Sequence, residues 1–169
     1  ENPVPDTFEL NLVSYGGYQM DAVAKEALEQ MRKACAYPTT IDNIYRSKAQ
    51  QELVWNSGVK RRMALGMTKK EAEAETARWA MTPGHSEHQT GLAVDMDTTG
   101  TLVTDFQYTD EYKWLSENAW KFGFVLRYPE DKANITGYSY ESWHYRFVGV
   151  AAATEIYERG ITLEEYLGK

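Results

Sequence analysis

The order in which helical and strand-like patterns follow one another restricts the fold of this chain more than any other feature. Apolar residues recur at helical spacing mainly in the first half, and short strand-like runs lie mostly in the middle and later parts. Strands and helices do not alternate regularly, which favours an α+β fold over a doubly wound parallel sheet. The predicted helices cover residues 20–35, 48–63, 69–80, the segment between Thr109 and Gly123, and 149–158, and the predicted strands cover 43–46, 92–96, 124–128 and 143–148.

Three helix starts carry capping signals. Ser47 precedes one predicted helix and can cap it. Thr68 and Glu71 form a capping box, in which each residue satisfies a free backbone N–H of the other. Thr162 and Glu165 repeat this pattern before a short terminal helix. These signals predict where three helices begin.

Length and composition indicate one globular domain, residues 1–169, in which residues 1–17 form an extended N-terminal segment. Hydrophobic residues make up 43% of the chain, and no linker or repeat divides it. The net charge of −7 argues against a nucleic acid partner, which selects a basic surface. The sequence has no run of 18 apolar residues, so we expect no transmembrane segment in it. Because the chain begins at Glu1 rather than Met, we expect it to be processed or trimmed, with any signal peptide or anchor removed.

The few histidines restrict where metal chemistry can occur. Catalytic zinc sites use three protein ligands, often imidazoles and a carboxylate, and keep a fourth position for water. His88, Asp95 and His144 form one candidate ligand set. Glu141, three residues before His144, can then serve as the general base that takes and returns a proton.

Spacing alone leaves alternatives to this set. His85 competes with His88, and Asp97 competes with Asp95. The order of residues from His85 to His88 is not the helical zinc-protease pattern, in which two histidines lie four residues apart with a glutamate after the first. Histidines that are simply hydrogen-bonded in a polar loop are the more frequent outcome for such spacing.

The spacing of Glu141 and His144 raises a geometric question. Residues three apart on a regular strand point to opposite faces of the sheet. Both side chains can therefore reach one site only if a turn or an irregular strand entry separates them. No glycine between Tyr138 and His144 marks such a turn.

Several blocks resemble one family of zinc peptidases. Residues 86–95, SEHQTGLAVD, are similar to the Ser-x-His-x-x-Gly-x-Ala-x-Asp motif of the VanY-type D-alanyl-D-alanine carboxypeptidases and the related L,D-carboxypeptidases. Residues 141–144, ESWH, resemble the second signature of that family. Residues 45–47, YRS, and the stretch 114–129 also resemble it, in the family's order. The likeness covers about residues 40–150.

This resemblance implies a fold, a cofactor and the reacting groups. The implied fold is a small central antiparallel sheet flanked by helices, as in the hedgehog/DD-peptidase fold. His88, Asp95 and His144 match the ligands of one Zn²⁺ ion, and Glu141 matches the general base. Arg46 matches an arginine that stabilises the oxyanion, a task that suits a permanently charged guanidinium.

The resemblance also implies residues that contact the substrate. Ser86 and Gln51 match positions near the substrate's terminal carboxylate, and Tyr45 belongs to the YRS block. Tyr138 and Tyr140 lie in a loop just before the second signature, where aromatic side chains often contact ligand. One departure is Ile44, which stands where many relatives have glycine before the YRS block.

The implied function is hydrolysis of the C-terminal D-alanine from peptidoglycan stem peptides. A D,D-carboxypeptidase is favoured, with an L,D-carboxypeptidase close behind. The alternatives are a peptidoglycan endopeptidase of the same superfamily and a non-catalytic zinc-containing binding module. The implied location is extracytoplasmic, in the cell wall or as a membrane-anchored ectodomain whose anchor lies outside this chain.

Two further features carry no catalytic assignment. Trp143, Tyr145 and Phe147 alternate along one predicted strand and are predicted to pack in the core, as is Trp79 on its predicted helix. Residues 60–62, KRR, form a basic run in an acidic chain. Its simplest interpretation is a solvated helix end, and contact with anionic wall polymers is the alternative.

Overall fold

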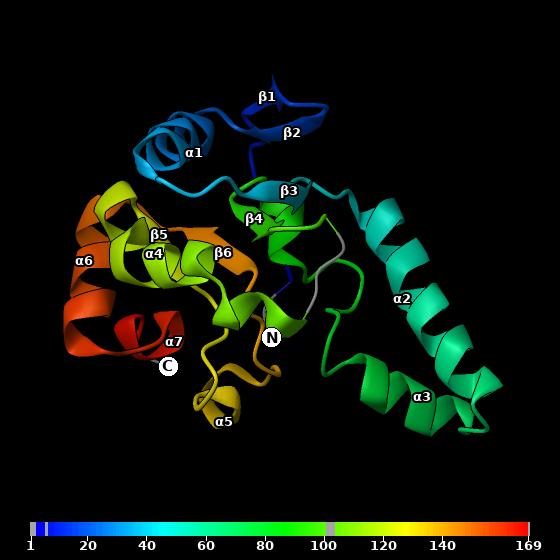
Figure 1. The fold of residues 1–169 in the computed structure, drawn as a ribbon. Helices are drawn as coiled ribbons and strands as arrows, with labels where there is room; N and C mark the ends of the chain where they lie inside the picture. The colour runs from blue at the N-terminus through cyan, green and yellow to red at the C-terminus, as the bar shows by residue number, and fades with distance from the viewer. Residues whose placement is uncertain (1–2, 6, 101–103, 169) are drawn as a thin grey trace.

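The structure, a computed structural model, describes residues 3–5, 7–100 and 104–168. A four-stranded sheet with the order β3-β4-β6-β5 lies at its centre, and a two-stranded hairpin, β1-β2, lies beside it (Figure 1). All strand pairs are antiparallel, which confirms the predicted α+β fold with a small antiparallel sheet. The strands are β1 (Leu12–Tyr15), β2 (Tyr18–Asp21), β3 (Thr40–Asn43), β4 (Ala93–Asp97), β5 (Phe124–Leu126) and β6 (His144–Phe147).

Helices flank the sheet. Figure 1 shows α1 near the hairpin, α4, α6 and α7 on one side of the sheet, and α2 and α3 extending away on the other. In the described parts of the chain, no helix is both long and apolar enough to cross a membrane. The helices are α1 (Ala22–Ala34), α2 (Lys48–Ala64), α3 (Lys69–Thr76), α4 (Asp110–Asn118), α5 (Ala133–Thr136), α6 (Val150–Arg159) and α7 (Leu163–Tyr166), with 3₁₀ turns η1 (Glu87–Thr90), η2 (Thr104–Tyr108) and η3 (Ala119–Phe122).

Three helix starts follow the capping signals. The Ser47 hydroxyl accepts the Gln50 N–H at the start of α2. The boxes at Thr68 and Thr162 close the starts of α3 and α7 in the same way. Local side-chain chemistry therefore sets these boundaries.

Strand β4 separates the core from the polar side of the sheet. Its side chains alternate, so Val94 and Met96 face one way while Asp95 and Asp97 face the other. Both apolar residues belong to the main core, and the partly buried Trp143 and Phe147 pack against it beside buried Tyr145. The main core consists of Met20, Ala24, Leu28, Met31, Ile44, Val94, Met96, Phe106, Leu115, Ala119, Phe124 and Tyr145.

The sequence pattern misplaced one strand and missed one hairpin. The strand predicted at 43–46 lies earlier, at β3, because Tyr45 N–H donates to Gln19 O and Arg46 N–H donates to His88 O instead of extending the pairing with β4. The hairpin β1-β2 was not predicted. Gly16 and Gly17 form its turn with positive φ at both positions, the geometry that a two-residue hairpin turn requires.

Trp79 also departs from its predicted role. It follows α3 with 43% of its surface exposed, so it does not pack in the core. Its indole N–H donates to Glu75 Oε1 at 3.3 Å. The side chain instead lines a pocket beside the sheet.

Candidate metal centre

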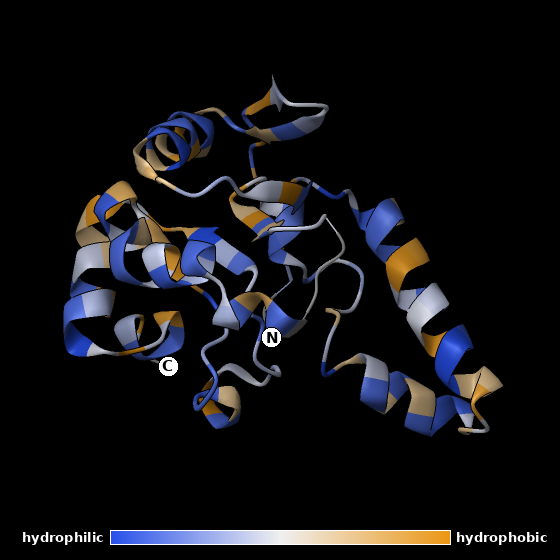
Figure 2. Cartoon of the chain, viewed as in Figure 1, coloured by the Kyte–Doolittle hydropathy of each residue, from blue (hydrophilic) through white to orange (hydrophobic). Residues whose placement is uncertain are grey.

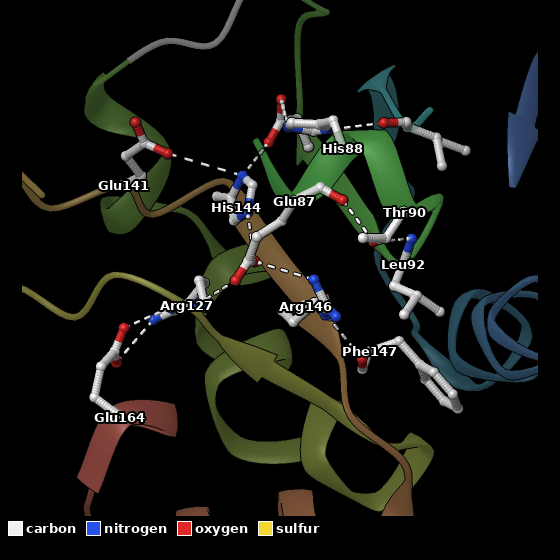
Figure 3. Close-up of polar contacts among 12 residues, drawn as sticks. Glu87, His88, Thr90, Leu92, Arg127, Glu141, His144, Arg146, Phe147 and Glu164 are labelled. Atoms are coloured by element: carbon white, nitrogen blue, oxygen red, sulfur yellow. Dashed lines mark hydrogen bonds and ion pairs between the residues drawn. The ribbon is translucent and has the colours of Figure 1, made fainter. Parts of the chain in front are cut away.

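Three elements bring the candidate ligands together. Asp95 on β4 and His144 on β6 are directly paired across the antiparallel sheet. His88 enters from η1, with its Nε2 3.2 Å from Asp95 Oδ2, while His144 Nδ1 lies 2.9 Å from Asp95 Oδ1 (Figure 3). One donor atom from each residue can be chosen so that all three lie within 4.8 Å of one another.

Gly91 turns the chain from η1 into β4. Its φ of +71° is a conformation that other residues adopt only with strain. A Cβ at this position would also lie 2.6 Å from Leu12 Cδ2 and 3.0 Å from Asp21 N, so the hairpin leaves no space for one. The glycine of the SEHQTGLAVD motif thus sets the angle between His88 and Asp95.

The orientation of His88 is fixed by a backbone carbonyl. His88 Nδ1 lies 2.5 Å from Ile44 O, so a proton on Nδ1 donates to that oxygen and leaves the Nε2 lone pair towards Asp95. The Ile44 side chain is buried in the main core. Isoleucine at position 44, where many relatives have glycine, therefore anchors the loop that holds His88.

The ring of His144 lies between two carboxylate environments. Its Nδ1 faces Asp95, and its Nε2 faces Glu87 Oε2 at 3.6 Å, slightly beyond hydrogen-bond distance. The negative charge of Glu87 favours a proton on Nε2, which leaves the Nδ1 lone pair available on the Asp95 side. Tyr128 packs against the same ring at 5.1 Å between centroids.

Glu87 is in turn held by a buried chain of charges. Arg127 Nε donates to Glu87 Oε1 at 2.7 Å, and the other Arg127 nitrogens donate to both carboxylate oxygens of Glu164 on α7. Arg146 Nη1 lies 3.7 Å from Glu87 Oε2 (Figure 3). Burial alone would raise the pKa of Glu87, but His144, Arg127 and Arg146 hold it below its usual range.

Sequence reasoning missed this network. Glu87 lies inside the recognised motif, yet its partner Arg127 is 40 positions further along the chain, and Glu164, which Arg127 also binds, is 77 positions further. No local spacing relates these three residues. Only the folded contact between η1, the end of β5 and α7 reveals that Arg127 bridges the two glutamates.

The donor set fits a zinc ion. Two imidazole nitrogens and one carboxylate oxygen are a frequent protein ligand set for catalytic zinc. Burial alone would raise the pKa of Asp95, but His88 and His144 hold it below its usual range, so the carboxylate is ionised and able to bind a cation. All three side chains are almost fully buried yet line an open pocket, which leaves one side of the cluster accessible.

Glu141 reaches the cluster through a turn. His144 N–H donates to Glu141 O at 3.3 Å, so the turn from 141 to 144 precedes β6 and brings both side chains to one side. Glu141 Oε2 lies 3.8 Å from His144 Nδ1. Burial raises the pKa of Glu141 to about 7, with nearby Asp95 adding to the effect and His144 and Arg46 opposing it.

Arg46 borders the same pocket, and a buried side chain outside the pocket holds it in place. Its Nε donates to Gln51 Oε1 at 2.6 Å, and Gln51 Nε2 donates to Met81 O at 2.6 Å. Gln51 is fully buried and does not line the pocket. Its amide therefore orients Arg46, whose remaining nitrogens are left for other partners.

The pocket has a volume of about 200 Å³. Of the residues that the resemblance connects with substrate, Ser86 and Tyr138 line it, and Tyr45 and Tyr140 do not. Burial and the nearby Tyr112 raise the pKa of Tyr140. The lining comprises Arg46, Val54, Trp79, Ala80, Met81, Ser86, Glu87, His88, Asp95, Tyr128, Tyr138, Glu141, Trp143 and His144.

The two rival ligands lie outside the cluster. His85 Nδ1 is 3.0 Å from Thr82 Oγ1, and its ring borders a different pocket. Asp97 is fully buried and accepts the backbone N–H groups of Thr99 and Gly100, so it closes the turn after β4. Neither belongs to the group of three that could bind a metal ion among the described residues.

Comparison with known proteins places this geometry in a family. The VanY family profile, described as D-alanyl-D-alanine carboxypeptidase, matches residues 17–150. A D-alanyl-D-alanine carboxypeptidase of Enterococcus faecalis is 40% identical over 172 aligned positions, which cover 99% of this chain and 63% of that protein. The chain thus spans somewhat less than two thirds of this curated relative.

Two solved structures share the fold at high similarity. VanYB in complex with D-alanine-D-alanine superposes with a TM-score of 0.91 at 39% identity, covering 99% of this chain and 93% of that one. A mutant of the vancomycin resistance D,D-pentapeptidase VanY in complex with Zn(II) superposes with a TM-score of 0.89 at 39% identity, covering 98% and 94%. The family match, the sequence identity and the fold agree, and this chain belongs to the VanY family of D-alanyl-D-alanine carboxypeptidases.

Proposed function

We propose that this chain is a zinc D,D-carboxypeptidase that releases the terminal D-alanine of peptidoglycan stem peptides outside the cytoplasm. The observation that carries the proposal is the convergence of His88, Asp95 and His144 on one pocket that Glu141 and Arg46 also line. The binding of D-alanine-D-alanine by VanYB, a structure that superposes over nearly the whole chain, supports the choice of substrate.

His88 Nε2, a carboxylate oxygen of Asp95 and His144 Nδ1 would hold the ion. A zinc ion at this position supplies a Lewis acid that polarises the scissile carbonyl and makes water more acidic. The buried Glu87 network keeps the His144 ring oriented for this contact.

Glu141 is the proton carrier in this mechanism. Its carboxylate takes a proton from the attacking water and then donates it to the leaving amine of the terminal D-alanine. A pKa of about 7 in the free protein suits a group that must both accept and donate a proton near neutral pH. The positive charge of a bound cation would favour its ionised form.

Arg46 and Ser86 supply the polar contacts of the substrate. The guanidinium stays charged and faces the carboxylates of Asp95 and Glu141, so it can stabilise the negative oxygen that develops during attack. The Ser86 hydroxyl lines the pocket as a partner for the substrate's free terminal carboxylate. Such a partner favours an exopeptidase over an enzyme that cuts inside the stem.

The other candidate functions differ in measurable products. An L,D-carboxypeptidase would use the same groups and prefer a tetrapeptide stem, and an endopeptidase would release larger stem fragments. A non-catalytic binding module has no need for both Glu141 and Arg46 at the pocket. We also propose that the protein acts in the cell wall or as a membrane-anchored ectodomain.

The test offers pentapeptide and tetrapeptide stems in parallel to the zinc-loaded protein and identifies the products by mass spectrometry. We expect the pentapeptide to lose one alanine faster than the tetrapeptide does, and a chelator to stop the reaction until zinc is restored. Faster cleavage of the tetrapeptide would assign L,D specificity, and a cut inside the stem would assign an endopeptidase. If protein that retains zinc cleaves neither stem, the non-catalytic binding module would be the remaining candidate function.

A further inference from the structure

Helices α2 and α3 form an arm that projects from the body of the molecule (Figure 1). The two helices pack mainly on each other, with Gly58 and Val59 of α2 and Ala72 and Thr76 of α3 buried between them. The base of the arm borders the metal pocket through Val54 and Trp79. Its far end, residues 60–70, is called the tip below.

The tip exposes large apolar side chains. Leu65 ends α2 with 77% of its surface exposed, and Met63 and Met67 on either side are 45% and 36% exposed. Figure 2 shows hydrophobic colouring at the turn that joins α2 to α3. These residues contribute nothing to the core, and adjacent exposed apolar residues usually mark a contact surface.

The tip is also strongly basic. It contains Lys60, Arg61, Arg62, Lys69 and Lys70 and no acidic residue. Because the whole chain has a net charge of −7, the rest of the chain carries −12 against the +5 of the tip.

Two acidic residues just beyond the tip, Glu71 and Glu73, offset part of its charge. The Glu71 carboxylate accepts Thr68 N–H and O–H in the capping box, and Glu73 lies 3.7 Å from Lys69. Arg62 also donates to Gly58 O, within α2. Lys60, Arg61 and Lys70 are exposed to solvent, as is Leu65.

Cations that surround exposed apolar side chains are the surface chemistry that binds anionic bilayers. The basic groups attract lipid headgroups, and the apolar groups enter the boundary with the acyl chains. A soluble polyanion needs only the cations and gives no reason for Met63, Leu65 and Met67 to be exposed together. We propose that the tip docks on an anionic lipid bilayer.

Docking by the tip would set the height of the active site. The part of α2 between Val54 and Leu65 spans about 16 Å at the helical rise of about 1.5 Å per residue. An extended five-residue peptide reaches roughly 17 Å. A pocket held at that height can therefore receive stem peptides attached to the bilayer, a consequence that rests on the proposed function, whereas docking itself does not.

Vesicle co-sedimentation tests docking without any substrate. The zinc-loaded protein is mixed with vesicles of phosphatidylcholine alone or with phosphatidylglycerol added. We expect binding only to the anionic vesicles, weakening as salt rises. The triple variant Met63→Ser, Leu65→Ser and Met67→Ser, which keeps every charge, should bind about tenfold or more weakly.

Two matched controls isolate the tip. Leu53→Ser removes an apolar side chain that is 70% exposed on α2 away from the tip, and should bind like the unmodified protein. Replacing Lys60, Arg61 and Lys70 by Gln should abolish binding, whereas replacing the exposed Lys33, Lys113 and Lys121 by Gln changes the net charge equally and should not. Unchanged zinc content and circular dichroism establish that each variant is folded.

Three results would overturn the proposal. The first is equal binding to neutral and anionic vesicles, or to neither. The second is undiminished binding of the serine variant together with full competition by soluble polyphosphate. That result would indicate attraction to any polyanion. The third is a dimer in light scattering that the serine variant abolishes, which would assign the tip to a second copy of the chain.

Discussion

The metal cluster and the α2-α3 arm are built in opposite ways. Each ligand of the cluster comes from a different element, and its position depends on the register of β4 with β6 and on the contact of His88 with the Ile44 carbonyl. The arm depends on neighbours in sequence, with capping boxes at both helix starts and one interface between its own helices. The comparison teaches that the chemistry requires the whole fold, whereas the part of the arm beyond Gln51 and Val54 can vary without disturbing it.

The metal cluster and the arm also differ in the burial of their side chains. Glu87, Asp95, Arg127 and His144 are charged or polar groups inside the protein, and each is compensated by a named partner. The tip of the arm leaves its large apolar side chains in solvent. Substitutions in the two regions should therefore differ in size and in what they affect.

The largest effect is expected for Glu141→Gln. The amide keeps the size of the side chain but cannot carry the proton, so kcat should fall by about 10²–10⁴-fold. Zinc content should stay at the unmodified level, because Glu141 is not a ligand. Steady-state kinetics with the pentapeptide stem and elemental analysis check both parts, and a kcat near the unmodified value would remove Glu141 from the mechanism.

Arg127→Ala should have the next largest effect, on global stability. The buried Arg127 is the shared cation of Glu87, which is largely buried, and Glu164, which is partly exposed. Breaking a buried ion pair costs about 3–5 kcal/mol of unfolding free energy, and we expect a loss towards the lower end of that range. Denaturant unfolding of the zinc-free protein measures this loss of unfolding free energy. Arg159→Ala, which breaks an exposed pair with Glu155, is the control and should cost about 0.5 kcal/mol or less. Equal losses in the two variants would contradict the role given to burial.

Glu87→Gln should weaken zinc binding about 10–100-fold, the usual effect of removing a group that orients a metal ligand. The neutral amide no longer favours a proton on His144 Nε2. Competition with a chromophoric chelator gives the affinity, and Glu155→Gln on the exposed face of α6 is the control. If Glu87→Gln binds zinc as tightly as the unmodified protein, the sheet alone orients His144.

The smallest effect is expected in the arm. Thr68→Ala removes the cap of α3 and should lower the local stability of α3 by about 1 kcal/mol. Hydrogen exchange should show faster exchange in α2 and α3 and unchanged protection in β4 and β6. Zinc affinity should not change. A loss of affinity comparable to that of Glu87→Gln would show that the arm and the metal cluster are coupled.

The same contrast explains what the sequence could predict. Helix starts at Ser47, Thr68 and Thr162 were predicted, because a cap is a contact between residues three apart. The displacement of the strand expected at 43–46 could not be predicted, because the hydrogen bonds of Tyr45 and Arg46 go to Gln19 and His88, far away in the chain.

The metal cluster was accessible only through several blocks of resemblance considered together. The residues alone left His85 and Asp97 as rivals, and the structure resolves both by giving them other partners. The turn between Glu141 and His144, with no glycine to mark it, joins two side chains that a regular strand would separate. The contacts of Arg127 depend on tertiary structure that no motif encodes.

X-ray absorption at the zinc edge examines the ligand set itself. With one equivalent of zinc bound, we expect only nitrogen and oxygen neighbours at about 2.0–2.2 Å, including two imidazoles, and a loss of one imidazole in His144→Ala. A sulfur neighbour at about 2.3 Å would implicate Cys35, the single cysteine, which lies outside the cluster. That result, or an unchanged spectrum in His144→Ala, would contradict the ligand set of His88, Asp95 and His144.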